Sequence, residues 1–396
     1  MDINQISSTE ILKPQDWTFP IPIAYGPGRI NQIAEICQSL GINHPLIVTD
    51  RSSEDLPFIG RLIDLLNKAN IKSGLFTGVS PNPRDDEISE GSSYYKSGGH
   101  DAVIAIGGGS AMDGSKAICL TANNEIPLWD FEWEKEPAMI QEDSPFPKLI
   151  CIPTTAGTGA ETEGTAMVTD TEQDMKFCIC HPKLKPSIAI LDPELTLELP
   201  RSLTAWTGVD AMIHSIEAYC VPGFHPLCDG AALESLSLIS ENLIHAVNEP
   251  DNIKARGAML VASCLGGIAF IKGLGLVHAI SHMVGAEFDT HHGLTNAIVL
   301  PVVTRFNFPQ LEGKVQKMSS AMQYDDHSVD AFISNIDEML DRIEIPKNLA
   351  EIGVPVDCVE RISEKAMKDS AFATNPIIAN LEEMKQLVSQ SIKQAR

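Results

Sequence analysis

Apolar and polar positions follow different patterns in the two halves of the chain. Up to about residue 197, short apolar runs alternate with amphipathic stretches. The runs predict strands at 45–49, 73–78, 102–106, 149–153, 165–169, 176–180 and 187–191. Helical patterns, such as 57–69 and 110–121, separate the earlier runs. This alternation is typical of a mostly parallel sheet covered by helices on both faces.

The pattern changes twice along the chain. The runs between 165 and 191 leave no room for helices, which predicts a hairpin-like addition. After 191–200 nearly every stretch has helical spacing, for example 203–219, 228–247, 253–270 and 329–343. We therefore predict an α/β domain over residues 1–197 and an all-α domain over residues 198–396. Within the first, 1–16 is expected to form a loosely held arm, and 128–137 an excursion from the domain.

Composition narrows the class of protein. The chain has 396 residues, is 43% hydrophobic and carries a formal net charge of −24, which argues against nucleic acid or an anionic membrane as partner. The N-terminus lacks the pattern of a signal peptide, and the apolar run Gly257–Ile271 is too short to span a bilayer, so a buried helix is expected there. Nine cysteines without a CxxC pair favour reduced thiols and a cytoplasmic protein.

Histidines cluster in the segment from Gly273 to Asn296. His278 and His282 are four residues apart, as are Asp210 and His214 upstream, so each pair would share a helix face. One carboxylate with several imidazoles suits Fe(II) or Zn(II). The alternative interpretation is that these are core histidines whose hydrogen bonds are satisfied. Ala279 excludes the HExxH pattern of metalloproteases.

A glycine run follows the apolar strand at 102–106 in AVIAIGGGSAMDGSK. Glycines before a helix allow backbone N–H groups to approach phosphate oxygens, so this loop is a candidate phosphate site. The alternative is a turn in which Ser110 and Asp113 form a capping box. A second small-residue loop, PTTAGTGAE at 153–161, either lines the cofactor or is a flexible connection.

Asp50 ends the apolar run PLIVTD. A carboxylate at a strand end can accept hydrogen bonds from both ribose hydroxyls and repels a 2′-phosphate, which favours NAD over NADP. The alternative is that Asp50 caps the turn that follows it.

Taken together, several motifs resemble the iron-containing (group III) alcohol dehydrogenase family. They are GGGSAMDGSK, IPTTAGTGAE, LDPELT, GVDAMIHSIEAY, GLGLVHAISH and HHGLTNA, in family order from about Ile23 to Pro301. The resemblance implies the dehydroquinate synthase-like fold, in which a dinucleotide-binding α/β domain precedes an all-α metal-binding domain. It also implies an NAD-dependent, Fe(II)- or Zn(II)-requiring dehydrogenase of small primary alcohols or aldehydes that forms a homodimer or a larger homo-oligomer.

The resemblance also assigns residues. It implies that Asp210, His214, His278 and His292 hold the metal, and that His282 stands beside the nicotinamide and the substrate. His282 would then shuttle a proton or orient the substrate, unless it only packs there. His291 receives no role. The expected cofactor-binding residues are Asp50, Gly107, Gly108, Gly109, Ser110, Asp113, Thr154, Thr155, Thr158, Lys176 and Leu191. Without the resemblance, Lys176 would be a strand residue that faces water.

The chain departs from the family where many relatives have Asn and this sequence has Lys272. Lys272 is either a helix-end lysine that reaches solvent or a pocket residue that pairs with an anionic substrate, such as a short ω-hydroxy acid or its semialdehyde. Phe270 would line the same pocket or belong to the core. Two other functions stay open: a maleylacetate-type reductase, and an NAD-dependent metallo-lyase of the dehydroquinate synthase type.

Overall fold

The computed structural model describes residues 21–136, 138–140 and 145–394. The expected arm at 1–16 lies outside the described residues. The chain divides into two compact units. The N-terminal unit comprises Pro20–Thr155 and Ala160–Leu199, and the C-terminal unit comprises Pro200–Arg396 together with the short segment Ala156–Gly159.

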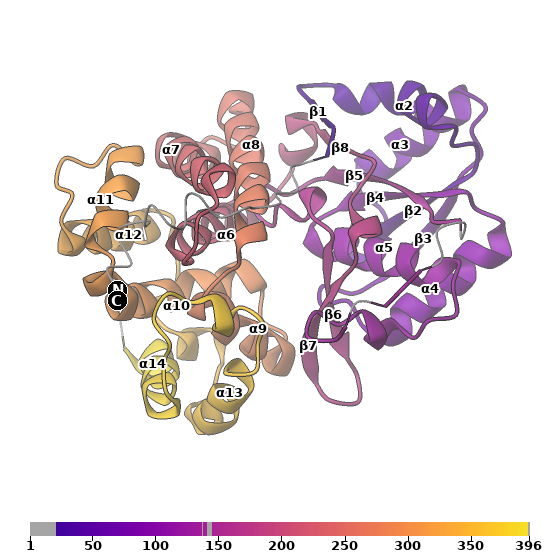
Figure 1. The fold of residues 1–396 in the computed structure, drawn as a ribbon. Helices are drawn as coiled ribbons and strands as arrows, with labels where there is room; N and C mark the ends of the chain where they lie inside the picture. Colours follow the sequence, from indigo (N-terminus) through magenta and orange to yellow (C-terminus); the bar gives the residue numbers. More distant parts are fainter. Residues whose placement is uncertain (1–20, 137, 141–144, 395–396) are drawn as a thin grey trace. The chain divides into compact units, whose positions relative to one another are not determined.

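A six-stranded parallel sheet forms the centre of the N-terminal unit (Figure 1). Its strand order is β1-β8-β5-β4-β2-β3, and every pairing is parallel. The strands are β1 (Ile23–Tyr25), β2 (Pro45–Asp50), β3 (Gly74–Val79), β4 (Ala102–Gly107), β5 (Lys148–Pro153) and β8 (Ile188–Leu191). Strand β1 was not predicted, because its three residues are too few to show a period in the sequence.

Side chains on the two faces of the sheet enter two separate cores. In β4, Val103 and Ala105 belong to one cluster, whereas Ile104 and Ile106 belong to the other. This alternation follows from the two-residue period of a strand, and it requires cover on both faces. The helices that give this cover are α2 (Ile33–Leu40), α3 (Pro57–Lys68), α4 (Asp85–Gly98) and α5 (Gly109–Ala122).

The predicted hairpin-like addition is present. Strands β6 (Thr165–Asp170) and β7 (Met175–Cys180) pair antiparallel and form a separate two-stranded sheet. Their short connection cannot hold the crossover that a parallel pair needs. The Trp133 amide donates to the Cys178 carbonyl at 2.9 Å, so the described part of the 128–137 excursion is joined to β7.

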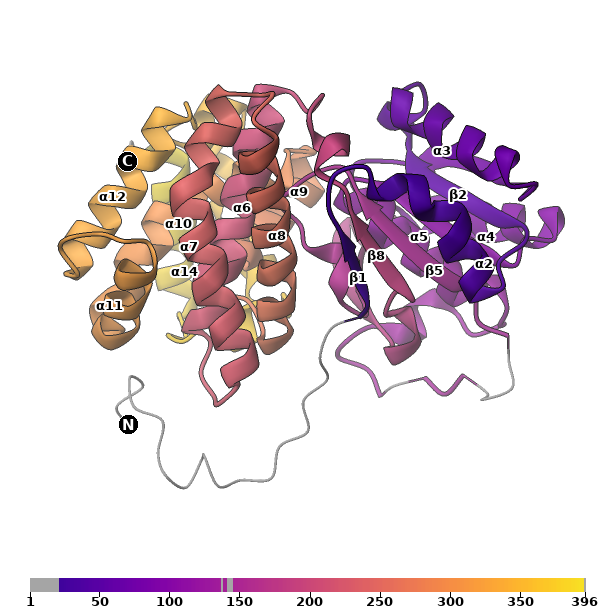
Figure 2. The same cartoon turned by 90° about the horizontal axis from the view of Figure 1, so that it is seen from above.

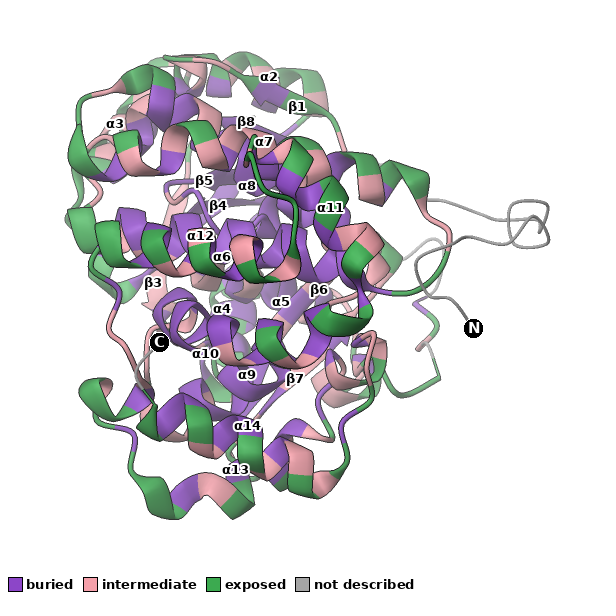
Figure 3. Ribbon diagram, turned by 90° about the vertical axis from the view of Figure 1, so that its left-hand side faces the viewer, coloured by how far each residue is buried: buried purple, intermediate pink, exposed green. Residues whose placement is uncertain are grey.

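Helices are the regular secondary structure of the C-terminal unit over its described residues, and loops connect them (Figure 2). Its helices are α6 (Arg201–Cys220), α7 (Pro226–Asn248), α8 (Ile253–Ala269), α9 (Leu276–Phe288), α10 (His292–Asn307), α11 (Glu312–Ala321), α12 (Val329–Arg342), α13 (Val359–Ala366) and α14 (Leu381–Lys393). Helices α6, α9 and α10 are buried over most of their surface, whereas α12 and α13 alternate between buried and exposed residues (Figure 3). A helix buried on all sides can carry polar groups only where these find partners.

One segment, Ile253–Lys272, is long and apolar enough by composition to cross a membrane. In the structure, 67% of its apolar window is buried inside the unit, where α8 packs against α6 and α7. This confirms the expectation of a buried helix.

Candidate active site

Four ligand-type side chains from three helices meet in the C-terminal unit. Helix α6 supplies Asp210 and His214, α9 supplies His278, and α10 supplies His292. Asp210 Oδ1 lies 3.9 Å from His214 Nε2, 3.8 Å from His278 Nε2 and 3.6 Å from His292 Nε2, and the four ligand atoms all lie within 4.8 Å of one another. Metal bonds of about 2.0–2.2 Å place tetrahedral ligands roughly 3.3–3.6 Å apart, so the cluster is slightly wider than a closed tetrahedral site.

Hydrogen bonds select the tautomer that two of these imidazoles adopt when they are neutral. His214 Nδ1 lies 3.1 Å from the Gly157 carbonyl oxygen, and His278 Nδ1 lies 2.6 Å from Glu217 Oε2. A carbonyl and a carboxylate only accept, so in both rings Nδ1 carries the hydrogen. The Nε2 lone pairs then point into the cluster, which is the arrangement that metal-bound histidines need.

The Asn296 amide nitrogen lies among the ligand atoms. It is 2.7 Å from Asp210 Oδ1, 3.1 Å from His278 Nε2 and 3.0 Å from His292 Nε2. Its two hydrogens cannot serve all of these acceptors. A buried group of acceptors with so few donors fits a cation.

A glycine allows α10 to approach α6 closely. A Cβ on Gly293 would lie 2.5 Å from the Trp206 carbonyl oxygen and 3.2 Å from Asp210 Cβ, which no side chain tolerates. The missing side chain therefore brings the neighbouring His292 within ligand distance of Asp210. His291 does not join the cluster, and its ring packs 5.0 Å from that of Trp206.

Burial and charge act differently on the ligand histidines. Burial lowers the pKa of His214 to about 4, and nearby Asp210 offsets only part of this shift. Burial also lowers the pKa of His278, but the hydrogen bond and charge of Glu217, with Asp210, outweigh it, so this pKa is raised above 6.5. His214 is thus neutral at neutral pH, whereas protons compete with a cation for His278.

His282 lies beside the cluster without joining it. Its ring stacks on that of His292 at 5.4 Å, and its Nδ1 lies 2.9 Å from Asp369 Oδ2. The His292 side chain is 28% exposed, whereas the other three ligand side chains are at most 5% exposed. His282 therefore lies next to the one of these four candidate ligands that is appreciably exposed.

A candidate nucleotide site lies at the carboxyl ends of β2 and β4. Strand β2 pairs with β3 on one side and with β4 on the other, so the strand order reverses there. Open α/β sheets bind ligands at such a switch point. Gly107, at the end of β4, has φ +145°, and a Cβ there would lie 2.8 Å from Ala111 Cβ and 3.1 Å from Asp50 Oδ2. The glycine loop and the Asp50 carboxylate therefore lie next to each other.

The proposed capping box of Ser110 and Asp113 is absent. Helix α5 begins at Gly109, and its N-cap is Gly108, which makes no side-chain cap hydrogen bond. The helix begins two residues too early for Ser110 to cap it. A helix N-terminus without a side-chain cap directly after a buried strand is a ready anion site, as the phosphate interpretation requires.

Asp50 does cap its own turn. It accepts hydrogen bonds from the Ser52 amide at 3.1 Å, from the Ser52 hydroxyl, and from the Ser53 hydroxyl at 2.8 Å. The alternative interpretation is thus structurally correct, but it does not exclude contact with a ribose, because a carboxylate offers about four lone-pair positions.

Hydroxyls near the glycine loop lack partners among the described residues. Thr49 Oγ1 and Thr155 Oγ1 are buried without a hydrogen bond there. Thr49 Oγ1 lies 3.4 Å from the Cβ position of Gly107, and Thr155 Oγ1 lies 3.8 Å from that of Gly108. Buried hydroxyls usually have a partner, so this edge of the sheet suits a polar ligand. The Thr154 amide donates to the Gly107 carbonyl at 2.9 Å, which joins the two loops.

The remaining residues that were expected to bind the cofactor are Lys176, Asp113, Leu191 and Thr158. Lys176 is 8% exposed, so the expectation that it faces water is wrong. Burial raises the pKa of Asp113 to about 7, although Lys116 acts against this. Leu191 is buried, and its carbonyl accepts from the Gly26 amide. Thr158 lies in the segment Ala156–Gly159, which belongs to the C-terminal unit.

Comparison with known proteins places this arrangement in a family. Residues 20–193 match the family described as iron-containing alcohol dehydrogenase, and residues 204–392 match the C-terminal part of the same family. The chain therefore belongs to the iron-containing alcohol dehydrogenase family.

Individual members of the iron-containing alcohol dehydrogenase family resemble the chain over nearly its full length. An NAD-dependent methanol dehydrogenase of Bacillus methanolicus is 32% identical over 93% of this chain and 97% of its own. A 4-hydroxybutyrate dehydrogenase of Cupriavidus necator is 32% identical over 92% of this chain and 96% of its own. A crystal structure of a 1,3-propanediol oxidoreductase matches with a TM-score of 0.90 and 32% identity, and it covers 96% of this chain and all of that one.

Lys272, which was expected to reach either solvent or the pocket, has a partner on another helix. Its Nζ lies 2.7 Å from Asp229 Oδ1 on α7, and its side chain is 5% exposed. The expectation that Lys272 reaches solvent is therefore wrong. Phe270, in contrast, lies at the cluster of candidate metal ligands, with its ring 5.0 Å from that of His214.

Sequence reasoning missed three polar residues of the site. Glu217 follows His214 by three positions and Asn296 follows His292 by four, so helical spacing places each on the face of a ligand. That spacing is the signal that could have found them. Asp369 is 87 residues from His282, and its own surroundings in the sequence give no signal.

Proposed function

We propose that the protein is an NAD-dependent, metal-requiring oxidoreductase that interconverts small primary alcohols and the corresponding aldehydes. The observation that carries the proposal is the buried set Asp210, His214, His278 and His292, in which two imidazoles are held with Nε2 lone pairs pointing inward. Family membership supports the reaction class, and the glycine loop at the switch point supports the nucleotide.

These four residues would hold a divalent cation, and the N-terminal unit would bind the nucleotide. The cation supplies Lewis acidity toward an alcohol or carbonyl oxygen, and NAD supplies the hydride acceptor. We propose Fe(II), and elemental analysis of protein purified without added metal tests this. Stoichiometric zinc with full activity would refute the choice of iron, because such donor sets bind both metals.

We assign proton transfer to His282. Asp369 accepts from Nδ1, so the neutral ring presents a lone pair on Nε2, which can take a proton from an alcohol. The other role that this position allows is orientation of the substrate by the same nitrogen.

We propose NAD over NADP because Asp50 lies at the cofactor end of the sheet. Its carboxylate is 3.1 Å from the Cβ position of Gly107, where it would repel a 2′-phosphate. A higher kcat/KM with NADP would refute this assignment.

The finer choice of substrate depends on Lys272. A short ω-hydroxy acid would need the ammonium to leave Asp229, whereas a neutral alcohol leaves the ion pair intact. The structure thus favours a neutral substrate. Comparison of kcat/KM for 4-hydroxybutyrate and butanol decides between them.

The reaction class is tested by NADH formation with a panel of primary alcohols and ω-hydroxy acids. Protein loaded anaerobically with Fe(II) is compared with EDTA-treated protein, and an Asp210→Asn variant serves as the control. Metal-dependent reduction of NAD supports the proposal. Metal-loaded protein that binds NADH but reduces NAD with no member of the panel would refute the substrate class.

A further inference from the structure

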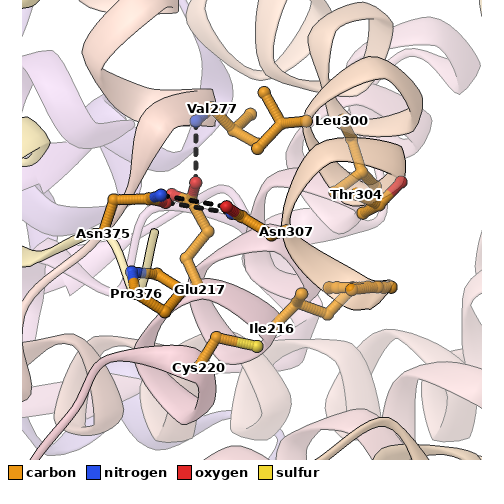
Figure 4. A pocket seen from close by; sticks show the side chains of 11 residues that line it. Ile216, Glu217, Cys220, Val277, Leu300, Thr304, Asn307, Asn375 and Pro376 are labelled. Atoms are coloured by element: carbon orange, nitrogen blue, oxygen red, sulfur yellow. Dashed lines mark hydrogen bonds between the residues drawn. The ribbon is translucent and has the colours of Figure 1, made fainter. Parts of the chain in front are cut away.

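Glu217 lies on the same face of α6 as the two ligands that this helix supplies. It follows His214 by three residues and Asp210 by seven, and it is 5% exposed. Its carboxylate points toward the first turn of α9, the helix that carries His278 (Figure 4). A buried carboxylate is costly unless several donors surround it.

The first turn of α9 provides two of these donors. Glu217 Oε1 accepts from the Val277 amide at 2.7 Å, and Oε2 accepts from the Gly275 amide at 3.1 Å. The N-cap of this helix is Gly275, which has no side chain to cap it. Negative charge at a helix N-terminus also interacts favourably with the helix dipole.

A second side chain caps the same turn without touching a metal ligand. Asn375 Oδ1 accepts from the Leu276 amide at 3.1 Å. Asn375 also exchanges two hydrogen bonds of 3.0 Å with the amide of Asn307, as Figure 4 shows. Asn375 therefore caps the turn but does not orient a candidate metal ligand. This makes it a matched control for Glu217.

Glu217 does more than cap, because Oε2 also lies 2.6 Å from His278 Nδ1. One carboxylate thus fixes the backbone that precedes the histidine and the orientation of the ring itself. The carboxylate cannot donate, so it selects the tautomer in which His278 Nε2 carries the lone pair. That nitrogen lies 3.8 Å from Asp210 Oδ1, among the four ligand atoms.

We propose that Glu217 is the positioning residue of the metal centre, which holds His278 in the metal-binding tautomer and fixes the start of α9 beneath it. The inference rests on the proposed function, because it assumes that the four-residue cluster binds a divalent cation. It extends that function by assigning a residue that does not itself contact the metal.

The decisive variant is Glu217→Gln. Three N–H donors meet the carboxylate, from Gly275, Val277 and His278, and a glutamine amide offers only one oxygen against them. Loss of such a partner of a ligand typically costs about 10- to 100-fold in metal affinity. The control Asn375→Ser disturbs the same turn but leaves the His278 contact intact, so its affinity should stay within about twofold of the unchanged protein.

The affinity for Zn²⁺ and Co²⁺ is measured by competition with a chromophoric chelator, on full-length protein without substrate or NAD. Thermal unfolding of the metal-free proteins is recorded in parallel, and both variants are expected to lose stability. A Glu217→Gln variant that binds metal as tightly as Asn375→Ser would refute the proposal. An unchanged protein that binds no divalent metal would refute the proposed function, and this inference with it.

A second measurement needs no variant of Glu217. In zinc-loaded protein with ¹⁵N-labelled histidine, the ring of His278 should show a protonated Nδ1 and a metal-bound Nε2, assigned by comparison with His278→Ala. This result supports the proposal even if Glu217→Gln does not fold. A metal-bound Nδ1 would overturn it, because that nitrogen could not then donate to Glu217.

Discussion

Replacement of Asp369 by asparagine tests the assigned role of His282 directly. Asp369 Oδ1 accepts from the Ala371 amide at 2.8 Å, and Oδ2 accepts from His282 Nδ1 at 2.9 Å. In Asp369→Asn the amide oxygen is held by the Ala371 N–H, so the NH₂ group faces His282 Nδ1. Two donors would then face each other unless the imidazole moves its hydrogen to Nε2.

The expected loss of rate follows from the burial of the His282–Asp369 hydrogen bond. Side-chain exposure is 8% for His282 and 2% for Asp369. A hydrogen bond to a charged group contributes about 1.5–3 kcal/mol, which corresponds to about 10- to 150-fold in rate. We expect kcat/KM for alcohol oxidation to fall by such a factor, because a protonated Nε2 cannot accept the proton of the alcohol.

The assay compares steady-state alcohol oxidation by the unchanged protein, by Asp369→Asn, by His282→Ala and by the double variant. Metal content and NADH binding are measured for each. If the aspartate acts through the histidine, Asp369→Asn has little further effect once His282 is replaced. Activity of Asp369→Asn within about twofold of the unchanged protein, with equal metal content, would refute the reasoning.

Four further changes test other parts of the molecule. Asp50→Gly should raise the ratio of kcat/KM with NADP to that with NAD, because the charge opposing a 2′-phosphate is removed. Gly107→Ala should weaken NADH binding, as titrated by fluorescence, because the new Cβ would lie 2.8 Å from Ala111 Cβ. Burial raises the pKa of Glu161 to about 7. The stability that the protonated carboxyl contributes is therefore present at pH 4 and lost as the pH rises through 7. Glu161→Gln cannot ionise, so it should raise Tm more at pH 8 than at pH 5. Lys272→Met leaves Asp229 without its ion-pair partner, so Tm should fall while the preference between 4-hydroxybutyrate and butanol stays unchanged.

The sequence predicted most of the fold because its periodic signals are long. Strand-like runs from residue 45 onward fall on strands of the structure, and the helical spacing after residue 200 falls on helices. The short strand β1 and the helix start at Gly109 were missed because neither extends over enough residues to show a period. Tertiary contacts decide their limits, and such contacts leave no period in the sequence.

In the candidate site, too, the sequence predicted what a local spacing shows and missed what distant contacts decide. The pair Asp210 and His214 is visible as a spacing of four on one helix, and the structure brings their ligand atoms to 3.9 Å. The environment of Lys272 could not be predicted, because its partner Asp229 is 43 residues away on α7. A positive charge next to a candidate pocket predicts an anionic ligand only when no other helix supplies a negative partner. The local sequence does not show whether such a partner is present.

The two hydrogen-bonded carboxylates outside the ligand set have a common consequence for the histidines of α9. Glu217 holds Nδ1 of His278, and Asp369 holds Nδ1 of His282, so both rings present Nε2. Yet His278 lies 3.8 Å from Asp210 Oδ1 in the ligand cluster, whereas His282, one turn later, stacks on the more exposed His292. The same tautomer would therefore serve the two tasks that we propose for these rings, metal binding by His278 and proton acceptance by His282. Position along the helix, and not ring chemistry, separates them.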